Sequence, residues 1–217
     1  MIPIHRHAGA YVSLVAAGSY DEASYDGRWH CETGCLILHP GYHAHFDDIG
    51  SAGAVVLNCS LTWAEAPREV QVWRVPALAR AVALFRDEPE RIGDLIGESE
   101  PVAPRTLPDW QAHIAAGAVA TDTPLAALAN EAGVSAEHAS RGIRKSLGLT
   151  PQALRAESRW RMALAGLGTD APLADIAADC GFADQSHLSR TVRQVTGLTP
   201  RALRWQINSV QERPDAP

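Results

Sequence analysis

The spacing of apolar residues changes character twice along the chain. Up to about residue 75, apolar residues alternate with polar ones or form short runs between turn residues, which is typical of β-strands. Turns are expected at Gly18-Ser19 and at residues 50–53, among other glycine-rich sites. The predicted strands are Tyr11–Ala16, Arg28–Cys31, Cys35–His39, Ala54–Leu61 and Val70–Val75. Many short strands joined by tight turns favour a small β-barrel or sandwich.

From residue 76 the apolar period becomes helical. Leu78, Val82 and Phe85 recur at the spacing of one helix face, and a second short helix is expected within Pro89–Gly97. Three prolines at residues 98–108 then predict a semi-stiff linker, after which Asp109 is expected to cap a helix. The predicted fold class is α+β with two domains. The expected parts are a β domain at 1–75, a helical connector and proline-rich linker at 76–107, an all-α domain at 108–208 and a tail at 209–217.

An internal repeat organises the C-terminal part. Ser140–Arg155 and Ser189–Arg204 lie 49 positions apart and share ten identities in sixteen positions. In each copy a short apolar-faced helix stops at a glycine, Gly133 or Gly181, and a second helix follows. Two short helices that meet at a glycine corner predict a helix-turn-helix, whose second helix can enter the major groove of DNA. The chain therefore predicts two such units.

Local start and stop signals support these helices. Asp122 or Thr123 is expected to cap the first unit, and Ser135, Thr150 and Asp184 are expected to cap later helices. Gly148 and Gly197 are placed to end the two second helices, because glycine tolerates the left-handed conformation of a helix C-terminus.

The repeat resembles the DNA-binding domain of the AraC/XylS family of transcription regulators, and Ile176–Arg204 is close to that family's signature. The resemblance implies seven helices, with a long one at about Pro151–Leu164 joining two units that read successive major-groove segments. It places the base-facing positions at Glu137, Ser140 and Arg141 in the first unit and at Gln185, Ser186, Ser189 and Arg190 in the second. The first unit departs from the family pattern at Ala139 and Gly142.

The chemistry of these residues agrees with DNA recognition. Arg can donate two hydrogen bonds to guanine, and Gln can pair with adenine. Arg144, Lys145 and Arg193 would lie on neighbouring ridges suited to phosphate contacts. The competing interpretation is a set of solvated helix faces. An overall charge of −6 does not favour DNA binding, but residues 112–217 carry a net charge of +1, so the acidic excess lies in the N-terminal part.

The N-terminal part resembles a cupin, the kind of domain that AraC-type regulators commonly carry as a sensor or dimeriser. The spacing of the first cupin motif is present with Tyr11 in place of glutamate. His5 and His7 point to one face of a strand, and His45 from a neighbouring strand would complete a site for a divalent metal such as zinc. His43 and Tyr11 are possible further donors. The alternative is that these histidines are only hydrogen-bonded. Cys31, Cys35 and Cys59 with His30 form a second candidate for metal or redox sensing.

These features predict a sequence-specific DNA-binding transcription regulator rather than an enzyme. Its N-terminal domain would sense a small-molecule effector or a metal, or would mediate dimerisation; the connector helices would cover the barrel or pair in a homodimer. RNA polymerase is a further expected partner if the protein is an activator. A metal-dependent cupin enzyme fused to a DNA-binding module is the alternative. No apolar run of membrane-spanning length is present, so a cytoplasmic protein with no membrane contact is expected.

Overall fold

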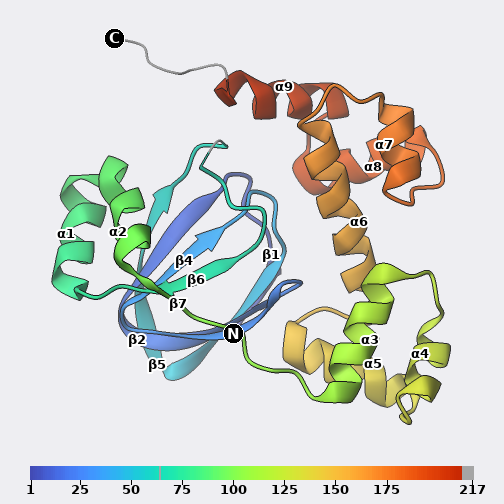
Figure 1. The fold of residues 1–217 in the computed structure, drawn as a ribbon, viewed down its shortest axis with the longest axis horizontal. Helices are drawn as coiled ribbons and strands as arrows, with labels where there is room; N and C mark the ends of the chain where they lie inside the picture. The colour runs from blue at the N-terminus through green and yellow to red at the C-terminus, as the bar shows by residue number, and fades with distance from the viewer. Residues whose placement is uncertain (64, 212–217) are drawn as a thin grey trace.

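The computed structural model describes residues 1–63 and 65–211, so part of the predicted tail, residues 212–217, lies outside the described residues. An antiparallel sheet curls into a barrel at the N-terminal side, and a helical region follows it (Figure 1). The two-domain α+β fold is therefore confirmed. The strands in chain order are β1 (Ile2–His5), β2 (Tyr11–Ser24), β3 (Gly27–Glu32), β4 (Cys35–His39), β5 (His45–Ser60), β6 (Gln71–Arg74) and β7 (Glu100–Pro101).

Two long strands form the centre of the sheet. The strand order is β1-β5-β2-β4-β6-β7, and β3 pairs with β2. The predicted turns at Gly18-Ser19 and at residues 50–53 are wrong, because β2 and β5 continue through both positions and pair along their lengths. The pairing register shifts next to Gly18, which has φ of 74°. A side chain there would overlap the carbonyl oxygen of Gly53, so glycine serves a bulge in a bent strand rather than a turn.

The predicted connector helices cover the sheet. They form α1 (Leu78–Asp87), a short 3-10 helix η1 (Pro89–Arg91) and α2 (Ile92–Glu98). Leu84 and Leu95 are buried against the sheet residues Leu14 and Leu36. The start of the predicted linker also belongs to the barrel, because β7 pairs with β6 and the Val102 N–H donates to the Val72 carbonyl at 2.8 Å.

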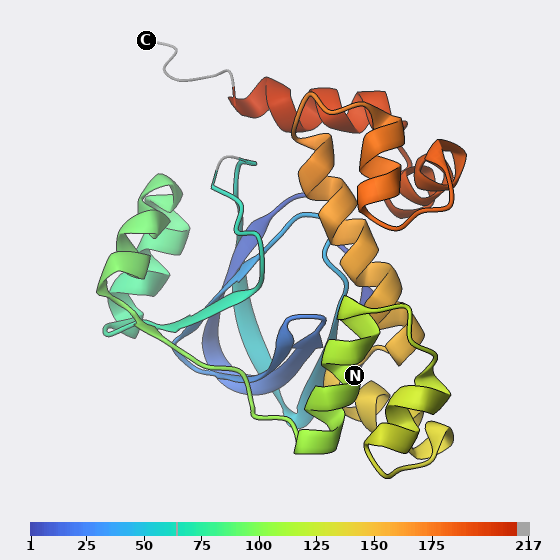
Figure 2. The same ribbon diagram turned by 45° about the vertical axis from the view of Figure 1, so that its right-hand side comes forward.

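Seven helices form the C-terminal domain within the described residues. They are α3 (Asp109–Ala120), α4 (Leu125–Glu131), α5 (Ala136–Leu147), α6 (Pro151–Leu167), α7 (Leu173–Asp179), α8 (Gln185–Thr196) and α9 (Pro200–Gln211). The long helix α6 ends three residues later than the sequence predicted. It runs between the two helix-turn-helix units and alongside the barrel (Figure 2).

The predicted helix caps divide into two groups. Ser135, Thr150 and Asp184 each accept a hydrogen bond from the backbone N–H three residues ahead, as predicted. Gly148 and Gly197 end α5 and α8 with φ of 74°, also as predicted. The caps predicted at Asp109, Asp122 and Thr123 are wrong, because Pro108 and Pro124 occupy the cap positions of α3 and α4 without a side-chain hydrogen bond. A proline in extended conformation is enough to start these helices.

The repeat extends further upstream than the sequence identities indicated. Gly117 in α3 lies against Leu128, and a Cβ at residue 117 would be 2.5 Å from Leu128 Cδ2. Gly166 in α6 lies against Ile176 in the same way, with 3.1 Å to Cγ2. Each unit therefore includes a third helix, which carries a glycine where the first helix of the helix-turn-helix crosses it.

An arginine at the end of each repeat holds this third helix in place. Arg155 donates to the carbonyls of Ala118 and Thr123 at 3.0 and 2.7 Å. Arg204 donates to the corresponding carbonyls, those of Leu167 and Ala171, at 3.3 and 2.6 Å. Each arginine therefore satisfies one carbonyl in the last turn of the third helix and one in the loop that follows it, so its identity in the repeat has a structural reason.

Candidate nucleic-acid interface and histidine cluster

The second recognition helix, α8, separates a buried face from a polar one. Leu188 and Val192 are fully buried against α6 and α9. The predicted contact residues lie on the other side, where Gln185, Ser186, Arg190 and Arg193 are exposed and Ser189 is half-buried. Neither arginine has an ion-pair partner among the residues that the structure describes, so both guanidinium groups are available to a ligand.

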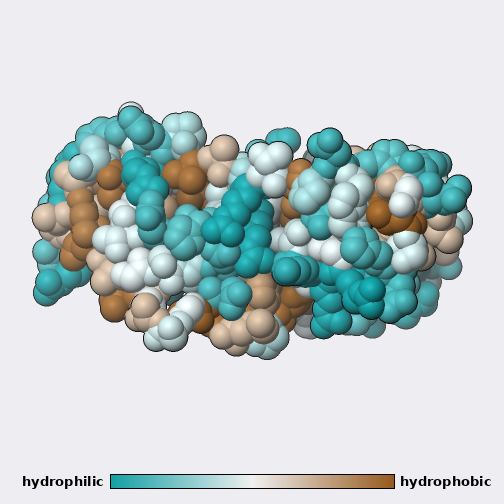
Figure 3. Space-filling view, turned by 90° about the horizontal axis from the view of Figure 1, so that it is seen from below, coloured by the Kyte–Doolittle hydropathy of each residue, from teal (hydrophilic) through white to brown (hydrophobic). Residues whose placement is uncertain are grey.

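The first recognition helix, α5, has the same division with different chemistry. Its predicted contact residues are exposed or half-buried: Glu137, Ser140, Arg141, Arg144 and Lys145. Arg141 Nη1 donates to Glu137 Oε1 at 2.6 Å, one helical turn away, so two of the predicted base-facing residues neutralise each other. Seen from below, the surface mixes hydrophilic residues with apolar patches, and hydrophilic residues gather at the right, where this unit lies (Figure 3).

Gly142 in α5 has a packing role. A Cβ at residue 142 would overlap the ring of Trp110, with 3.1 Å to Cζ2, so glycine lets α3 approach α5 closely. Ala139, one turn earlier, is fully buried in the same core. Gly142 therefore allows a large tryptophan to pack against α5.

The barrel brings three of the predicted ligands together. His5 and His7 lie at the end of β1 and just beyond it, and His45 begins β5. Their donor nitrogens all lie within 4.8 Å of one another. The Tyr11 hydroxyl is 3.2 Å from His45 Nε2, and Asp47 Oδ2 is 3.9 Å from His5 Nε2. The histidines line a cavity of about 240 Å³ inside the barrel.

The electrostatics of the cavity suit imidazole ligands. Burial lowers the pKa of His45 to about 3, and burial together with the neighbouring His5 lowers the pKa of His7. Neutral imidazole is the form that binds a metal ion. Burial raises the pKa of the Tyr11 hydroxyl, which stays protonated. Burial and the Glu22 charge raise the pKa of Asp47 to about 6.

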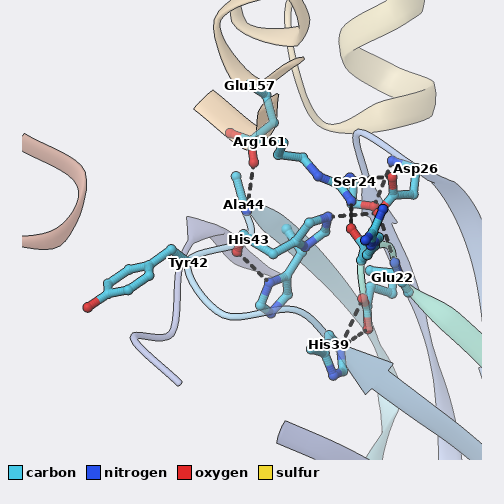
Figure 4. Close-up of polar contacts among 12 residues, drawn as sticks. Glu22, Ser24, Asp26, His39, Tyr42, His43, Ala44, Glu157 and Arg161 are labelled. Atoms are coloured by element: carbon cyan, nitrogen blue, oxygen red, sulfur yellow. Dashed lines mark hydrogen bonds and ion pairs between the residues drawn. The ribbon is translucent and has the colours of Figure 1, made fainter. Parts of the chain in front are cut away.

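His43 lies apart from this cluster. Its Nε2 is 3.1 Å from Asp26 Oδ2, and Figure 4 shows the ring directed at that carboxylate. Of the two additional donors that the sequence offered, only Tyr11 therefore lines the cavity.

A buried carboxylate and imidazole in the cavity were missed by sequence reasoning. His39 Nε2 lies 3.0 Å from both carboxylate oxygens of Glu22, and both side chains are almost fully buried. Burial would raise the pKa of Glu22, but the charge and hydrogen bond of His39 outweigh it and lower the pKa to about 2. Glu22 escaped notice because β2 was predicted to stop at residue 16.

The second candidate, Cys31, Cys35 and Cys59 with His30, does not form a metal-capable group among the described residues. His30 Nδ1 is 2.7 Å from Asp21 Oδ1. Burial raises the pKa of Cys31, Cys35 and Cys59, so all three remain weakly reactive thiols. His5, His7 and His45 are the metal-capable group found among the described residues.

Comparisons with known proteins agree with the duplicated unit. A family model described as a helix-turn-helix domain matches residues 128–206. A transcriptional regulator of Chromobacterium violaceum with an AraC-type DNA-binding domain is 26% identical, with 45% of this chain and 91% of that chain covered and a TM-score of 0.41. Fatty-acid-bound ToxT of Vibrio cholerae is 11% identical, with 98% and 92% covered and a TM-score of 0.46. TM-scores this low do not assign the arrangement of the whole chain.

No match was found among curated proteins. None of the described helices is long and apolar enough to cross a membrane. The family match covers both units of the repeat, and the two recognition helices within it have the caps, corners and polar faces that such units require. Residues 128–206 of this DNA-binding transcription regulator are a helix-turn-helix domain of the AraC type.

Proposed function

We propose that this regulator controls transcription in response to a small molecule or metal ion bound in its N-terminal barrel. One observation carries the proposal: a cavity lined by a cluster of histidines lies in the same chain as two recognition helices with exposed polar faces. An effector that binds one arrangement of the domains better than another would change DNA affinity by that difference.

The DNA contacts are assigned by side-chain chemistry and exposure. Arg190 and Gln185 at the exposed start of α8 are proposed to read base edges, with Ser186 and Ser189 beside them. Arg193, with Arg144 and Lys145 on α5, is proposed to contact phosphate. Because Glu137 pairs with Arg141, the second unit is proposed to supply more of the sequence preference than the first. A homodimer, and contact with RNA polymerase by an activator, belong to the same proposal.

The proposed ligand of the barrel is a divalent metal ion such as zinc at His5, His7 and His45. Three imidazoles match the nitrogen ligand set that zinc prefers, and Tyr11 or an organic effector could supply a further donor. The Glu22–His39 pair in the same cavity favours the alternative of a metal-dependent enzyme, because it sets a carboxylate beside an imidazole. A carboxylate with a pKa near 2 is a weak base at neutral pH, however, which favours sensing over proton transfer.

Selection of bound sequences from a random DNA pool tests the DNA-binding part. The expected result is one enriched motif, and an affinity for it that falls steeply with salt because several phosphates are contacted. No enrichment, or an affinity that does not depend on salt, would contradict the assigned interface.

Metal analysis of the purified protein tests the sensor part. One equivalent of zinc per chain is expected, and His7→Ala should lose most of it. His113→Ala, which changes an exposed histidine on α3, is the matched control and should retain the metal. Retention of zinc by both variants would rule out the cluster as its site.

A further inference from the structure

The middle of α6 is held against the barrel by buried polar contacts. Glu157 is 2% exposed and accepts a hydrogen bond from Arg6 Nη1 at 3.1 Å, while Arg6 Nη2 completes a two-bond ion pair with it. Glu157 also accepts from the Ala44 N–H at 3.3 Å (Figure 4). A buried carboxylate needs such partners, because an uncompensated charge in the interior is strongly destabilising.

The Tyr42 carbonyl strengthens this contact. It accepts from Arg6 Nη1 at 2.6 Å and from Trp160 Nε1 of α6 at 3.3 Å. Tyr42 has φ of 55°, a left-handed conformation that is uncommon for any residue other than glycine. The chain therefore adopts a strained turn that directs this carbonyl at α6, and such strain persists only where surrounding contacts maintain it.

A second ion pair lies one helical turn further along. Arg161 of α6 pairs with Asp26, which also faces His43, and its guanidinium carbon lies 5.1 Å above the Tyr25 ring. Asp26 is mostly buried and also accepts from the Val70 N–H at 2.9 Å. Two buried ion pairs thus fix one face of the helix that connects the two helix-turn-helix units.

The two barrel segments that contact Glu157 of α6 also supply the histidine cluster. Arg6 lies between His5 and His7, and Ala44 precedes His45. A tetrahedral zinc ion with nitrogen ligands at about 2.0–2.1 Å holds those nitrogens about 3.3 Å apart. The three imidazoles, whose nitrogens lie within 4.8 Å, would be drawn closer by such an ion. The ion would then crosslink the two segments that hold Glu157.

We infer that metal occupancy of the His5–His7–His45 cluster is coupled to DNA affinity through the Arg6–Glu157 contact on α6. This inference rests on the proposed sensing function and identifies the contact through which the barrel would act on the DNA-binding domain. When the ends of β1 and β5 are joined by the ion, Arg6 and Ala44 are held together on Glu157, and α6 is fixed against the barrel. A fixed α6 sets the separation and relative rotation of α5 and α8. The two helices then lose less conformational freedom when both bind one duplex, so DNA binding is tighter.

The test uses full-length protein and the motif selected from the random pool. Zinc binding is measured by calorimetry, and DNA affinity is measured with added zinc and with EDTA. In the native protein, zinc is expected to tighten DNA binding at least about 5-fold, the lower end of typical allosteric coupling. Arg6→Met keeps an unbranched side chain and removes the guanidinium group. In this variant zinc should still bind, but the DNA affinity should no longer respond to zinc. Glu157→Gln should also abolish the response of DNA affinity to zinc, and it changes the shape of the side chain less than Arg6→Met does.

Arg80→Met is the matched control, because it removes an ion pair with Glu98 on α1 and α2, away from the interface. It should behave as the native protein does. If zinc binds and DNA affinity does not change, or if Arg6→Met and Glu157→Gln respond as strongly as the control, the coupling route is wrong while the metal site stands. If zinc does not bind the native protein, the metal-sensing proposal fails and the inference fails with it.

Discussion

Gly142 offers a sharp test of how the first recognition helix is packed. It lies inside α5, where replacing glycine by alanine normally stabilises a helix by about 1 kcal/mol. In this structure the added Cβ would overlap the Trp110 ring, whose Cζ2 would be only 3.1 Å away, and it would lie 3.2 Å from Gln111 Nε2. Overpacking of this kind costs about 1–3 kcal/mol, so Gly142→Ala is expected to destabilise the protein by up to about 2 kcal/mol despite the better propensity.

Urea denaturation followed by far-ultraviolet circular dichroism measures this difference. Gly93→Ala is the matched control, because Gly93 lies in helix α2 with no atom within 4 Å of the added Cβ. That variant should gain up to about 1 kcal/mol. If Gly142→Ala is stabilised as much as Gly93→Ala, then Trp110 does not fill the space beside α5, and the close approach of α3 and α5 is wrong.

Three further predictions concern DNA contact and the barrel. Arg190→Ala should weaken binding to the selected motif by about 1–3 kcal/mol and relax the preference at one base pair, whereas Arg86→Ala on α1 should not; an unchanged footprint would remove Arg190 from the reading set. Glu22→Gln should lower the free energy of unfolding by about 1–3 kcal/mol, because the buried His39 Nε2 loses its hydrogen bond to a charged carboxylate; a thermal melt equal to that of the native protein would contradict this. Apart from the loss that the lowered pKa of His7 contributes, stability should change little between pH 6 and 4.5, and it should fall below about 4.5. His45 titrates at about 3 when folded and 6.5 when unfolded, so protonation of the unfolded chain costs stability as the pH falls. Asp47, with its pKa raised to about 6, opposes this until its unfolded value of 3.8, while Glu22, with its pKa near 2, adds to the loss below 4.5. A steady decline across pH 6 to 4.5 in equilibrium unfolding would show that Asp47 does not offset His45.

Signals that act within a few residues were read correctly from the sequence. Ser135 and Asp184 cap their helices, and Gly148 and Gly197 end theirs, because cap hydrogen bonds and left-handed φ values depend on local chemistry. The proline-led starts were misread, since an extended Pro124 begins α4 without help from the polar residues before it.

Signals in the barrel depended on partners far along the chain. Gly18 was interpreted as part of a turn. Glycine is needed there because Gly53 on the neighbouring strand approaches so closely that a side chain would overlap it. With β2 shortened in this way, Glu22 was left outside the predicted strand, and its pairing with His39 could not be anticipated. The proximity of His5, His7 and His45 was anticipated from strand alternation and the cupin-like spacing, although His7 lies just beyond the end of β1 rather than within it.

The sequence by itself determined the duplicated helix-turn-helix, its polar recognition faces and the histidines that meet in the barrel, because repeats, caps and strand alternation are local properties. Only the tertiary structure decided that Arg6 meets Glu157, 151 residues away, and that Trp110 occupies the space left by Gly142. The first contact depends on how two independently patterned domains pack, and the second depends on how two helices of one domain cross; no periodicity within a single segment encodes either arrangement.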